Sequence, residues 1–302
     1  MSINLAVVPV AGLGTRLLPA TKSQPKEMLP IGRKPVVQYV VEELANSGMQ
    51  RLLFVTGHGK GSIEDFFDVD QPLIEFLRTR GKEDQLAALE FERNNLQYAY
   101  TRQREQLGLG HAVLCAAPFV TNEPFVVALG DSILGLHGHS RVVQRMVDLC
   151  NERDAEVVVA FEELKCREDV VHYGIAQPGI ALGDDVFELT DVIEKPSPDE
   201  APSLLAVAAR YVFKPSIFDY LAKTERGKGN EIQLTDAMRA LLKDRPGSGI
   251  GVRLPPGESR YDIGNFASYF RAFIDFAAAD EEHGDMVREY LKTLANGRFA
   301  GG

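Results

Sequence analysis

A glycine-rich turn with positive charges nearby is the first feature of the sequence that could carry out chemistry. Gly12 and Gly14 lie in VPVAGLGTRLLP, directly after an apolar run. Glycines at such a turn let backbone N–H groups approach an anion closely. Arg16, and Lys26 in the following QPKEMLP, bring two positive charges to the same loop. The pattern favours a triphosphate site; the alternative is a strand-ending turn with solvated basic residues.

Two familiar phosphate loops do not fit this turn. A P-loop has a lysine and a hydroxyl residue directly after its second glycine, whereas Gly14 is followed by Thr15 and Arg16. The dinucleotide-binding turn has a third small residue where this chain has Leu17. An oxidoreductase that binds a dinucleotide is therefore disfavoured.

Two aspartates, far apart in the sequence, follow apolar strands. Asp131 lies in VVALGDS, and Asp262 lies in SRYDIGN at a strand-to-helix junction. Ligands of a parallel sheet bind in the crevice beyond the strand ends. Two carboxylates at one such crevice, beside a phosphate loop, predict a Mg²⁺ site, because this ion is usually shared between protein carboxylates and substrate phosphates. Considered singly, each aspartate is better explained as a helix cap.

Length and composition describe a globular chain of 302 residues, 45% hydrophobic and 25% charged. The net charge of −10 disfavours a nucleic-acid partner, so an anionic ligand needs a local basic pocket. No apolar stretch approaches the roughly 20 residues that cross a bilayer. We therefore expect no membrane partner and a cytoplasmic location. Cys115, Cys150 and Cys166 form no CxxC pair and are expected to be packing residues.

The apolar pattern predicts a βαβ arrangement in the first half of the chain. A helix is expected over 34–48, with Pro35 in its first turn and Gly48 at its end. A polar, leucine-bearing helical insert is expected over 72–93. Short apolar runs predict strands over 4–10, 51–56, 96–101 and 124–130. This alternation is typical of a largely parallel sheet.

The pattern changes toward strands after residue 151. The runs AEVVVAF, YGIAQ, DVFELTDVIEKP and LLAVAARYVF predict an antiparallel lobe added to the first sheet. Helices are expected over 215–223 and 231–243. Two amphipathic helices over 265–296 either contact a second copy of the chain or cover the sheet. The predicted fold class is α/β, a Rossmann-like, mostly parallel mixed sheet flanked by helices, with an added antiparallel lobe.

The motifs taken together resemble a known family. VPVAGLGTRLLPATKSQPKEMLPIGRKPVVQYVVEEL is similar to the amino-terminal signature of bacterial UTP-glucose-1-phosphate uridylyltransferases, within the sugar-phosphate nucleotidyltransferases. The match extends to about residue 275 through TRQREQLGLGHAVLCA, ALGDS, YGIAQ, VIEKP, ARYVF, NEIQLTDAM and RYDIGN. The chain departs from the family at Ser132, where a second aspartate is usual, in IGRKP instead of LVDKP, and at Ile263 instead of a cysteine.

The resemblance implies that a uridylyl group passes from UTP to glucose 1-phosphate, giving UDP-glucose and pyrophosphate. The nucleophile is already an anion, so no general base is required, and His111 is expected to be structural. Arg16 and Lys26 would neutralise charge on the leaving pyrophosphate, and Asp131 and Asp262 would hold Mg²⁺ between the phosphates. The alternatives are a thymidylyltransferase acting on glucose 1-phosphate and a non-catalytic relative that binds nucleotide sugars and regulates a partner.

The resemblance also implies two binding regions and a division of the chain. The nucleotide would be bound by Ala11, Gly12, Gly14, Thr15, Glu27, Gln103 and Gly108. Glucose 1-phosphate would be bound by Gly174, Glu194 and Lys195, the last on the phosphate. Singly, these residues could be a surface amide (Gln103), a strand bulge (Gly174) and an exposed charge pair (Glu194 and Lys195).

The catalytic domain would cover 1–275, with a nucleotide half over 1–150, a sugar-binding half over 151–275 and a helical tail over 276–302. We expect a homodimer or homotetramer.

Overall fold

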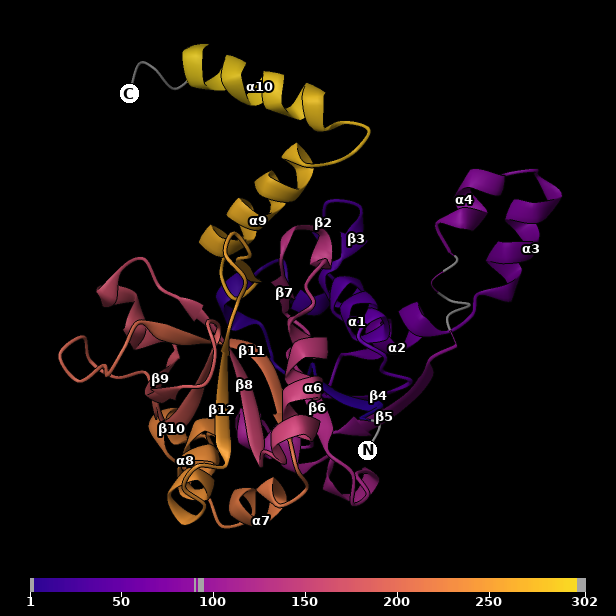
Figure 1. The fold of residues 1–302 in the computed structure, drawn as a ribbon. Helices are drawn as coiled ribbons and strands as arrows, with labels where there is room; N and C mark the ends of the chain where they lie inside the picture. The colour runs from indigo at the N-terminus through magenta and orange to yellow at the C-terminus, as the bar shows by residue number, and fades with distance from the viewer. Residues whose placement is uncertain (1–2, 90, 92–94, 298–302) are drawn as a thin grey trace.

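A nine-stranded mixed sheet forms the centre of the computed structural model (Figure 1). The structure describes residues 3–89, 91 and 95–297. From one edge to the other, the strands are β5 (Gln97–Arg102), β4 (Arg51–Thr56), β1 (Leu5–Pro9), β6 (Phe125–Ala128), β11 (Leu205–Phe213), β8 (Val157–Glu163), β12 (Gly249–Arg253), β10 (Val186–Glu194) and β9 (Gly174–Ala181). The predicted α/β fold class is confirmed.

The first half of the sheet is parallel, as its βαβ pattern predicts. Strand β1 pairs in parallel with β4 and β6, and β4 pairs in parallel with β5. Ala6 and Val8 of β1 face one core, while Leu5 and Val7 face the other. Because helices cover both faces, these strands are continuous apolar runs. One core includes α1 (Val36–Asn46), α2 (Gly61–Phe67) and α6 (Val142–Arg153), and the other includes α5 (Leu109–Leu114), α7 (Ile217–Leu221) and α8 (Leu234–Asp244).

Helix α1 differs slightly from its predicted bounds. Pro35 is its N-cap and so precedes the first turn that it was expected to join. Gly48 ends the helix as predicted, with a φ of 85° that lets Met49 N–H donate to Leu44 O at 3.0 Å.

The second half of the sheet is mostly antiparallel and continues the first without a break. Strand β11 is antiparallel to β6 on one side and to β8 on the other. Strand β12 is parallel to β8, and β10 is antiparallel to both β12 and β9. The predicted antiparallel lobe is therefore the far half of one sheet.

Two short antiparallel strand pairs, one of them a hairpin, extend from the sheet near the ends of its central strands. Strand β7 (Ser132–Leu134) pairs with β13 (Arg260–Asp262), which places Asp262 opposite Ser132. Strand β2 (Pro30–Ile31) pairs with β3 (Lys34–Pro35). A third hydrophobic core lies between these strand pairs, and Ile263 is fully buried in it. The departure from the family's cysteine is thus a packing difference.

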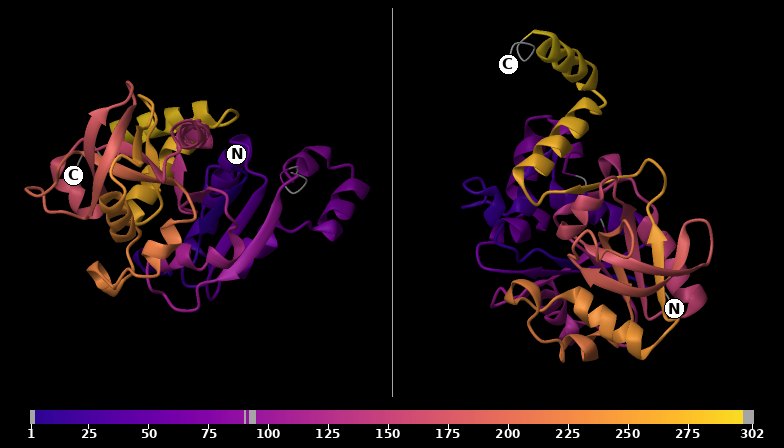
Figure 2. Two further views of the ribbon diagram at one scale, coloured as in Figure 1. Left: turned by 60° about the horizontal axis from the view of Figure 1, so that its bottom comes forward. Right: turned by 90° about the vertical axis from the view of Figure 1, so that its left-hand side faces the viewer.

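Two pairs of helices project from the body (Figures 1 and 2). The insert forms α3 (Gln71–Thr79) and α4 (Glu83–Ala87), because Gly81, with a φ of 64°, ends the first helix. Residues 90, 92 and 93 of the predicted insert lie outside the described residues. The tail forms α9 (Phe266–Ala278) and α10 (Gly284–Gly297), as predicted, but only Gly284 of α10 is buried. Helix α10 does not cover the sheet.

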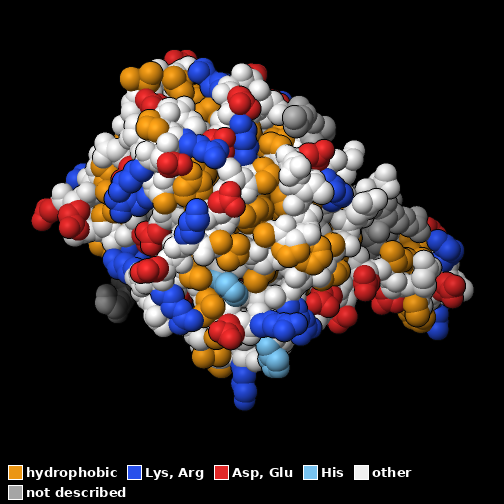
Figure 3. All heavy atoms as spheres, turned by 90° about the horizontal axis from the view of Figure 1, so that it is seen from below, with side chains coloured by type: hydrophobic (Ala, Val, Ile, Leu, Met, Phe, Trp, Pro, Cys, Tyr) orange, Lys and Arg blue, Asp and Glu red, His pale blue; other side chains and the backbone are white. Residues whose placement is uncertain are grey.

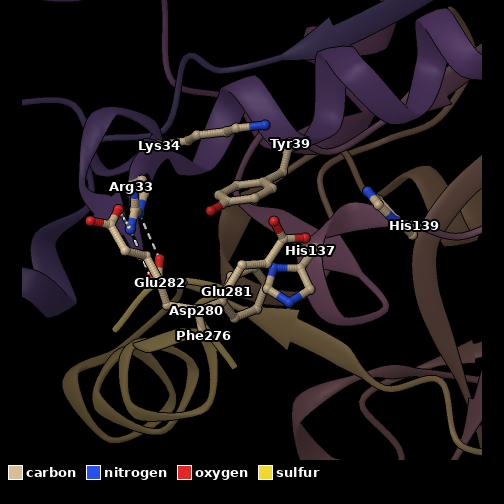
Figure 4. A pocket seen from close by; sticks show the side chains of 10 residues that line it. Arg33, Lys34, Tyr39, His137, His139, Phe276, Asp280, Glu281 and Glu282 are labelled. Atoms are coloured by element: carbon tan, nitrogen blue, oxygen red, sulfur yellow. Dashed lines mark hydrogen bonds and ion pairs between the residues drawn. The ribbon is translucent and has the colours of Figure 1, made fainter. Parts of the chain in front are cut away.

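Arg33 ties the turn between the tail helices to the β2–β3 hairpin. Its guanidinium donates to Asp280 at 2.6 and 2.8 Å and to Glu282 at 2.8 Å (Figure 4). These residues line a cavity of about 400 Å³ together with Tyr39, His137, His139 and Phe276. None of the predicted site residues lines this cavity. Arg33 belongs to the IGRKP departure, so the difference from the family supplies this contact with the tail.

The expectations drawn from composition have mixed outcomes. On the face seen in Figure 3, Lys and Arg side chains are interspersed with Asp and Glu side chains. Within residues 3–89, 91 and 95–297, none of the helices combines the length and the apolar character that crossing a membrane requires. Cys150 is buried and Cys115 is half-buried, but Cys166 is exposed. The packing role expected for Cys166 is therefore wrong.

Candidate active site

The glycine turn lies at the carboxyl ends of the parallel strands, as predicted. Gly14 adopts a left-handed conformation, with a φ of 67°, and its carbonyl accepts from Thr21 Oγ1 at 2.7 Å. Thr15 and Arg16 follow in an exposed 3-10 turn. The Lys26 side chain lies over Gly12, so that a Cβ there would be 3.6 Å from Lys26 Nζ. The turn therefore presents backbone and positive charge on one side of the sheet edge.

Lys26 donates to the carboxylate of Asp131, and both side chains are mostly buried. Burial would lower the pKa of Lys26, but the Asp131 charge, with Glu27 and Asp262, raises it well above its usual range. Burial would raise the pKa of Asp131, but the Lys26 ammonium outweighs it and holds this pKa low. The groups predicted to bind triphosphate and metal are thus in direct contact, both charged.

Asp262 lies beside this pair on β13. Ile263 N–H donates to Asp131 O at 2.9 Å, which joins the two aspartate segments. Arg16 Nη2 lies 2.9 Å from the point where a Cβ on Gly264 would be. Burial, and then the Asp131 charge, raise the pKa of Asp262. Two carboxylates that perturb each other in this way share one site.

The helix-cap alternative is wrong for both aspartates. The residue that caps α9 is Asn265, which accepts from Ser268 N–H at 3.1 Å, and not Asp262. Asp131 precedes a strand and not a helix. The pair fits a divalent cation, since its carboxylate oxygens are hard ligands; burial, and then the negative charge of Asp131, raise the pKa of Asp262. No cluster of three His, Cys, Asp or Glu side chains suited to a metal occurs in the described part of the chain. Phosphates and water would complete the coordination.

The predicted nucleotide residues come together beside the glycine turn. Gln103 is buried, and its Nε2 donates to Gly108 O at 2.9 Å and lies 3.1 Å from His111 Nδ1. Gln106 Nε2 donates to Ala11 O at 2.9 Å, which ties this segment to the turn. Gln103 is therefore not a surface amide, and the contact of His111 agrees with a structural role.

Gly108 and Glu27 complete the predicted nucleotide set. Gly108 has a φ of 95°, and a Cβ there would meet Glu231 Cβ at 2.6 Å, so only glycine fits. The carboxylate of Glu27 is buried and accepts from Lys60 Nζ at 2.8 Å. Glu27 lies at the site, with its charge already paired inside the protein.

The predicted sugar-phosphate residues line a cavity of about 150 Å³ next to the aspartates. Glu194 Oε2 accepts from Thr235 Oγ1 at 2.9 Å, and its Oε1 lies 3.1 Å from Lys195 Nζ. Gly174 is in regular register opposite Glu194, and a Cβ there would meet Thr235 Cγ2 at 2.9 Å. The bulge alternative for Gly174 is wrong, and the Glu194 carboxylate is mostly buried.

The family profile of nucleotidyl transferases matches residues 5–279. The chain belongs to the nucleotidyl transferase family. It is 45% identical over 292 residues to the UTP–glucose-1-phosphate uridylyltransferase YngB of Bacillus subtilis, covering 97% of this chain and 95% of that protein.

Solved structures agree with this assignment. The structure of a UDP-glucose pyrophosphorylase complexed with UDP-glucose matches with a TM-score of 0.80 and 37% identity over 97% of this chain and all of that one. The UTP-bound UGPase from Acinetobacter baumannii matches with a TM-score of 0.86 and 33% identity over the same shares. The resemblance found in the sequence is confirmed.

Three basic residues at the site of this nucleotidyl transferase escaped the sequence analysis. Lys60 follows β4, the parallel neighbour of β1. Its position after the end of a parallel strand is the sequence signal that could have placed it at the sheet edge. Arg260 lines the sugar-side cavity. The sequence signal that could have found it is its position two residues before Asp262, which puts both side chains on one face of a strand. Arg210 is fully buried and donates to Glu43 and to Ser132 O at 2.9 Å. Arg210 thereby anchors the segment that carries Asp131.

Proposed function

We propose that this nucleotidyl transferase transfers a uridylyl group from UTP to glucose 1-phosphate, giving UDP-glucose and pyrophosphate. The observation that carries the proposal is the joint position of three groups. Lys26, beside the glycine turn, contacts Asp131, and the strand that carries Asp262 also carries Arg260, which lines the cavity with Glu194. A relative of similar sequence is named for the same reaction, and similar proteins have been solved with UTP or UDP-glucose bound.

The chemistry follows from positioning and charge. An oxygen of the sugar phosphate attacks the α-phosphorus of UTP in line, and the bond to pyrophosphate breaks. The Lys26 ammonium leaves the carboxylate of Asp131 and binds the triphosphate instead. Arg16 and Lys26 together neutralise the charge of the leaving pyrophosphate. We assign Mg²⁺ to Asp131 and Asp262, where it would neutralise phosphate charge when bound. Lys195 holds the attacking phosphate, and Glu194 and Gly174 hold the glucose.

The nucleotide would lie on the other side of the aspartates. Ala11, Gly12, Gln103 and Gly108 would hold the uracil and its ribose, while Gly14 and Thr15 shape the turn for the triphosphate. Glu27 is a weaker candidate for contact with the nucleotide, because its carboxylate is already paired with Lys60. The division at residue 275 stays a prediction, and α9 runs across it.

We also propose that the chain forms a homodimer or homotetramer through its tail. Phe270, Phe273 and Ile274 of α9 are 56%, 41% and 45% exposed, which is unusual for large apolar side chains on one helix. Light scattering after size exclusion measures the assembly, and Phe270→Asp should shift it toward monomer. A monomeric wild-type protein would contradict this proposal. We also propose a cytoplasmic location, because the proposed reaction consumes a nucleoside triphosphate.

A pyrophosphate-release assay tests the function directly. UTP, dTTP, ATP and GTP are each combined with glucose 1-phosphate, mannose 1-phosphate and galactose 1-phosphate in the presence of Mg²⁺. UTP with glucose 1-phosphate should be the fastest pair. Equal rates with dTTP would contradict the uridylyl assignment, and the absence of turnover with every pair would contradict catalysis.

A further inference from the structure

Arg260 stands between the two parts of the site. It is two residues before Asp262 on β13, so the two side chains lie on one face of the strand. It also lines the cavity that contains Glu194 and Lys195. A positive charge here faces the position where the sugar phosphate meets the nucleotide.

The guanidinium of Arg260 is held in place, but part of its hydrogen-bonding capacity is unused. It stacks over the ring of Tyr173 at 4.4 Å, and Nη1 donates to Val207 O at 3.2 Å. Only 8% of the side chain is exposed. Its buried Nε finds no hydrogen-bond partner among the described residues. A buried donor without a partner is costly, so it calls for an acceptor from outside the protein, such as a ligand or a water molecule.

Among the described residues, Glu162 is the carboxylate that forms an ion pair with Arg260. Its Oε1 accepts from the backbone N–H of Arg260 at 3.1 Å, but its Oε2 is 3.7 Å from Arg260 Nε. That separation is too long for a hydrogen bond. Glu162 therefore fixes the strand and partly balances the Arg260 charge, but it leaves the Nε donor without a hydrogen bond.

We propose that Arg260 is a further catalytic residue, which binds the phosphate of the incoming sugar phosphate; this inference rests on the proposed function. Lys195 supplies a point charge, whereas Arg260 supplies a planar fork that suits two phosphate oxygens. The third oxygen stays free to attack the α-phosphorus as the bond to pyrophosphate breaks. The bound phosphate becomes the sugar-side phosphate of UDP-glucose. Arg260 therefore contacts glucose 1-phosphate and UDP-glucose, but not UTP.

Two variants and one control test this assignment. Arg260→Gln should lower kcat/KM for glucose 1-phosphate about ten- to a hundredfold, the loss expected for hydrogen bonds to a charged group. Its affinity for UDP-glucose, measured by calorimetry without added metal, should fall by a similar factor, while UTP affinity stays within about twofold. Arg260→Lys keeps the charge without the fork and should lose about fivefold in UDP-glucose affinity.

Arg239→Gln is the matched control, because Arg239 makes a two-point ion pair with Asp191, at 2.9 and 3.1 Å, and does not line the cavity. It should change neither affinity. Unchanged UDP-glucose affinity in a folded Arg260→Gln, or an equal loss of UTP affinity, would overturn the assignment. If Arg260→Gln does not fold, unchanged UDP-glucose affinity in Arg260→Lys overturns it instead. A wild-type protein that binds UDP-glucose without turning over would count against the proposed function, not against Arg260.

Discussion

Replacing Lys60 by methionine should destabilise the protein through the charge left on Glu27. The two side chains are 5% and 2% exposed, and their charged atoms are 2.8 Å apart. Removing one partner of a buried ion pair costs about 3–5 kcal/mol, because the other charge stays buried without compensation. Lys26 lies close enough to Glu27 to influence its pKa, so we expect the lower end, about 3 kcal/mol. Against a typical stability of about 5–15 kcal/mol, this is a large loss.

The loss should depend on pH in a defined direction. Burial raises the pKa of Glu27, and Lys60 opposes that rise. Lys60→Met removes the opposition, so the folded-state pKa rises further above the unfolded value of about 4.3. A carboxyl group whose pKa is higher in the folded state than in the unfolded state favours folding when it is protonated. The penalty of Lys60→Met should therefore be small below about pH 4 and grow as the pH rises through the folded-state pKa.

Urea unfolding of four proteins measures this effect: wild type, Lys60→Met, Glu27→Gln and the double variant. The double variant should recover most of the stability, because neither charge is left alone. Lys34→Met is the control: its ion pair with Glu42 is partly exposed, at 38% and 26%, and should be worth at most about 1 kcal/mol. The reasoning is refuted if Lys60→Met costs no more than Lys34→Met, or if the double variant is less stable than both single variants.

Three further predictions concern catalysis. Asp131→Asn should lower kcat far more than the affinity for metal-free UTP, measured by calorimetry; near wild-type turnover at saturating Mg²⁺ would remove Asp131 from the site. Gln103→Ala should raise KM for UTP and change KM for glucose 1-phosphate much less, because the buried amide lies beside the glycine turn; initial rates with the reverse pattern would place it on the sugar side. Lys195→Ala should lower kcat/KM for glucose 1-phosphate about ten- to a hundredfold and leave UTP binding unchanged, whereas Lys26→Ala should weaken UTP more than UDP-glucose; calorimetry with both ligands would contradict this if the two variants behaved alike.

The sequence predicted the parts of the fold that depend on local pattern. Continuous apolar runs identify strands that are covered on both faces, and a charged residue after such a run, such as Asp131, must lie at the sheet edge. The sequence could not reveal which side chains meet across that edge. The contact of Lys60 with Glu27 joins loops after different strands, and the Arg210 contact with Ser132 O crosses between strands 78 positions apart.

The direction of the tail was equally inaccessible to sequence analysis. An amphipathic pattern shows that a helix has an apolar face, but it does not show what covers that face. The turn before α10 is tied to the β2–β3 hairpin by Arg33 and Asp280, which are 247 positions apart. The break of the insert at Gly81 is different, because the glycine itself was a visible signal.

Strand β11 has a consequence for how the two substrates meet. It hydrogen-bonds to β6, which leads to Asp131, and to β8 and β9 of the sugar side, and all of its residues are buried. The halves that we propose to bind the two anions are therefore joined by one continuous, fully buried strand and not by a hinge. Their separation is set when the chain folds, so most of the orientational freedom that two reactants in solution would lose is removed in advance of every turnover. Such a scaffold raises the effective concentration of one substrate toward the other, and only loops and side chains such as Lys26 need to move.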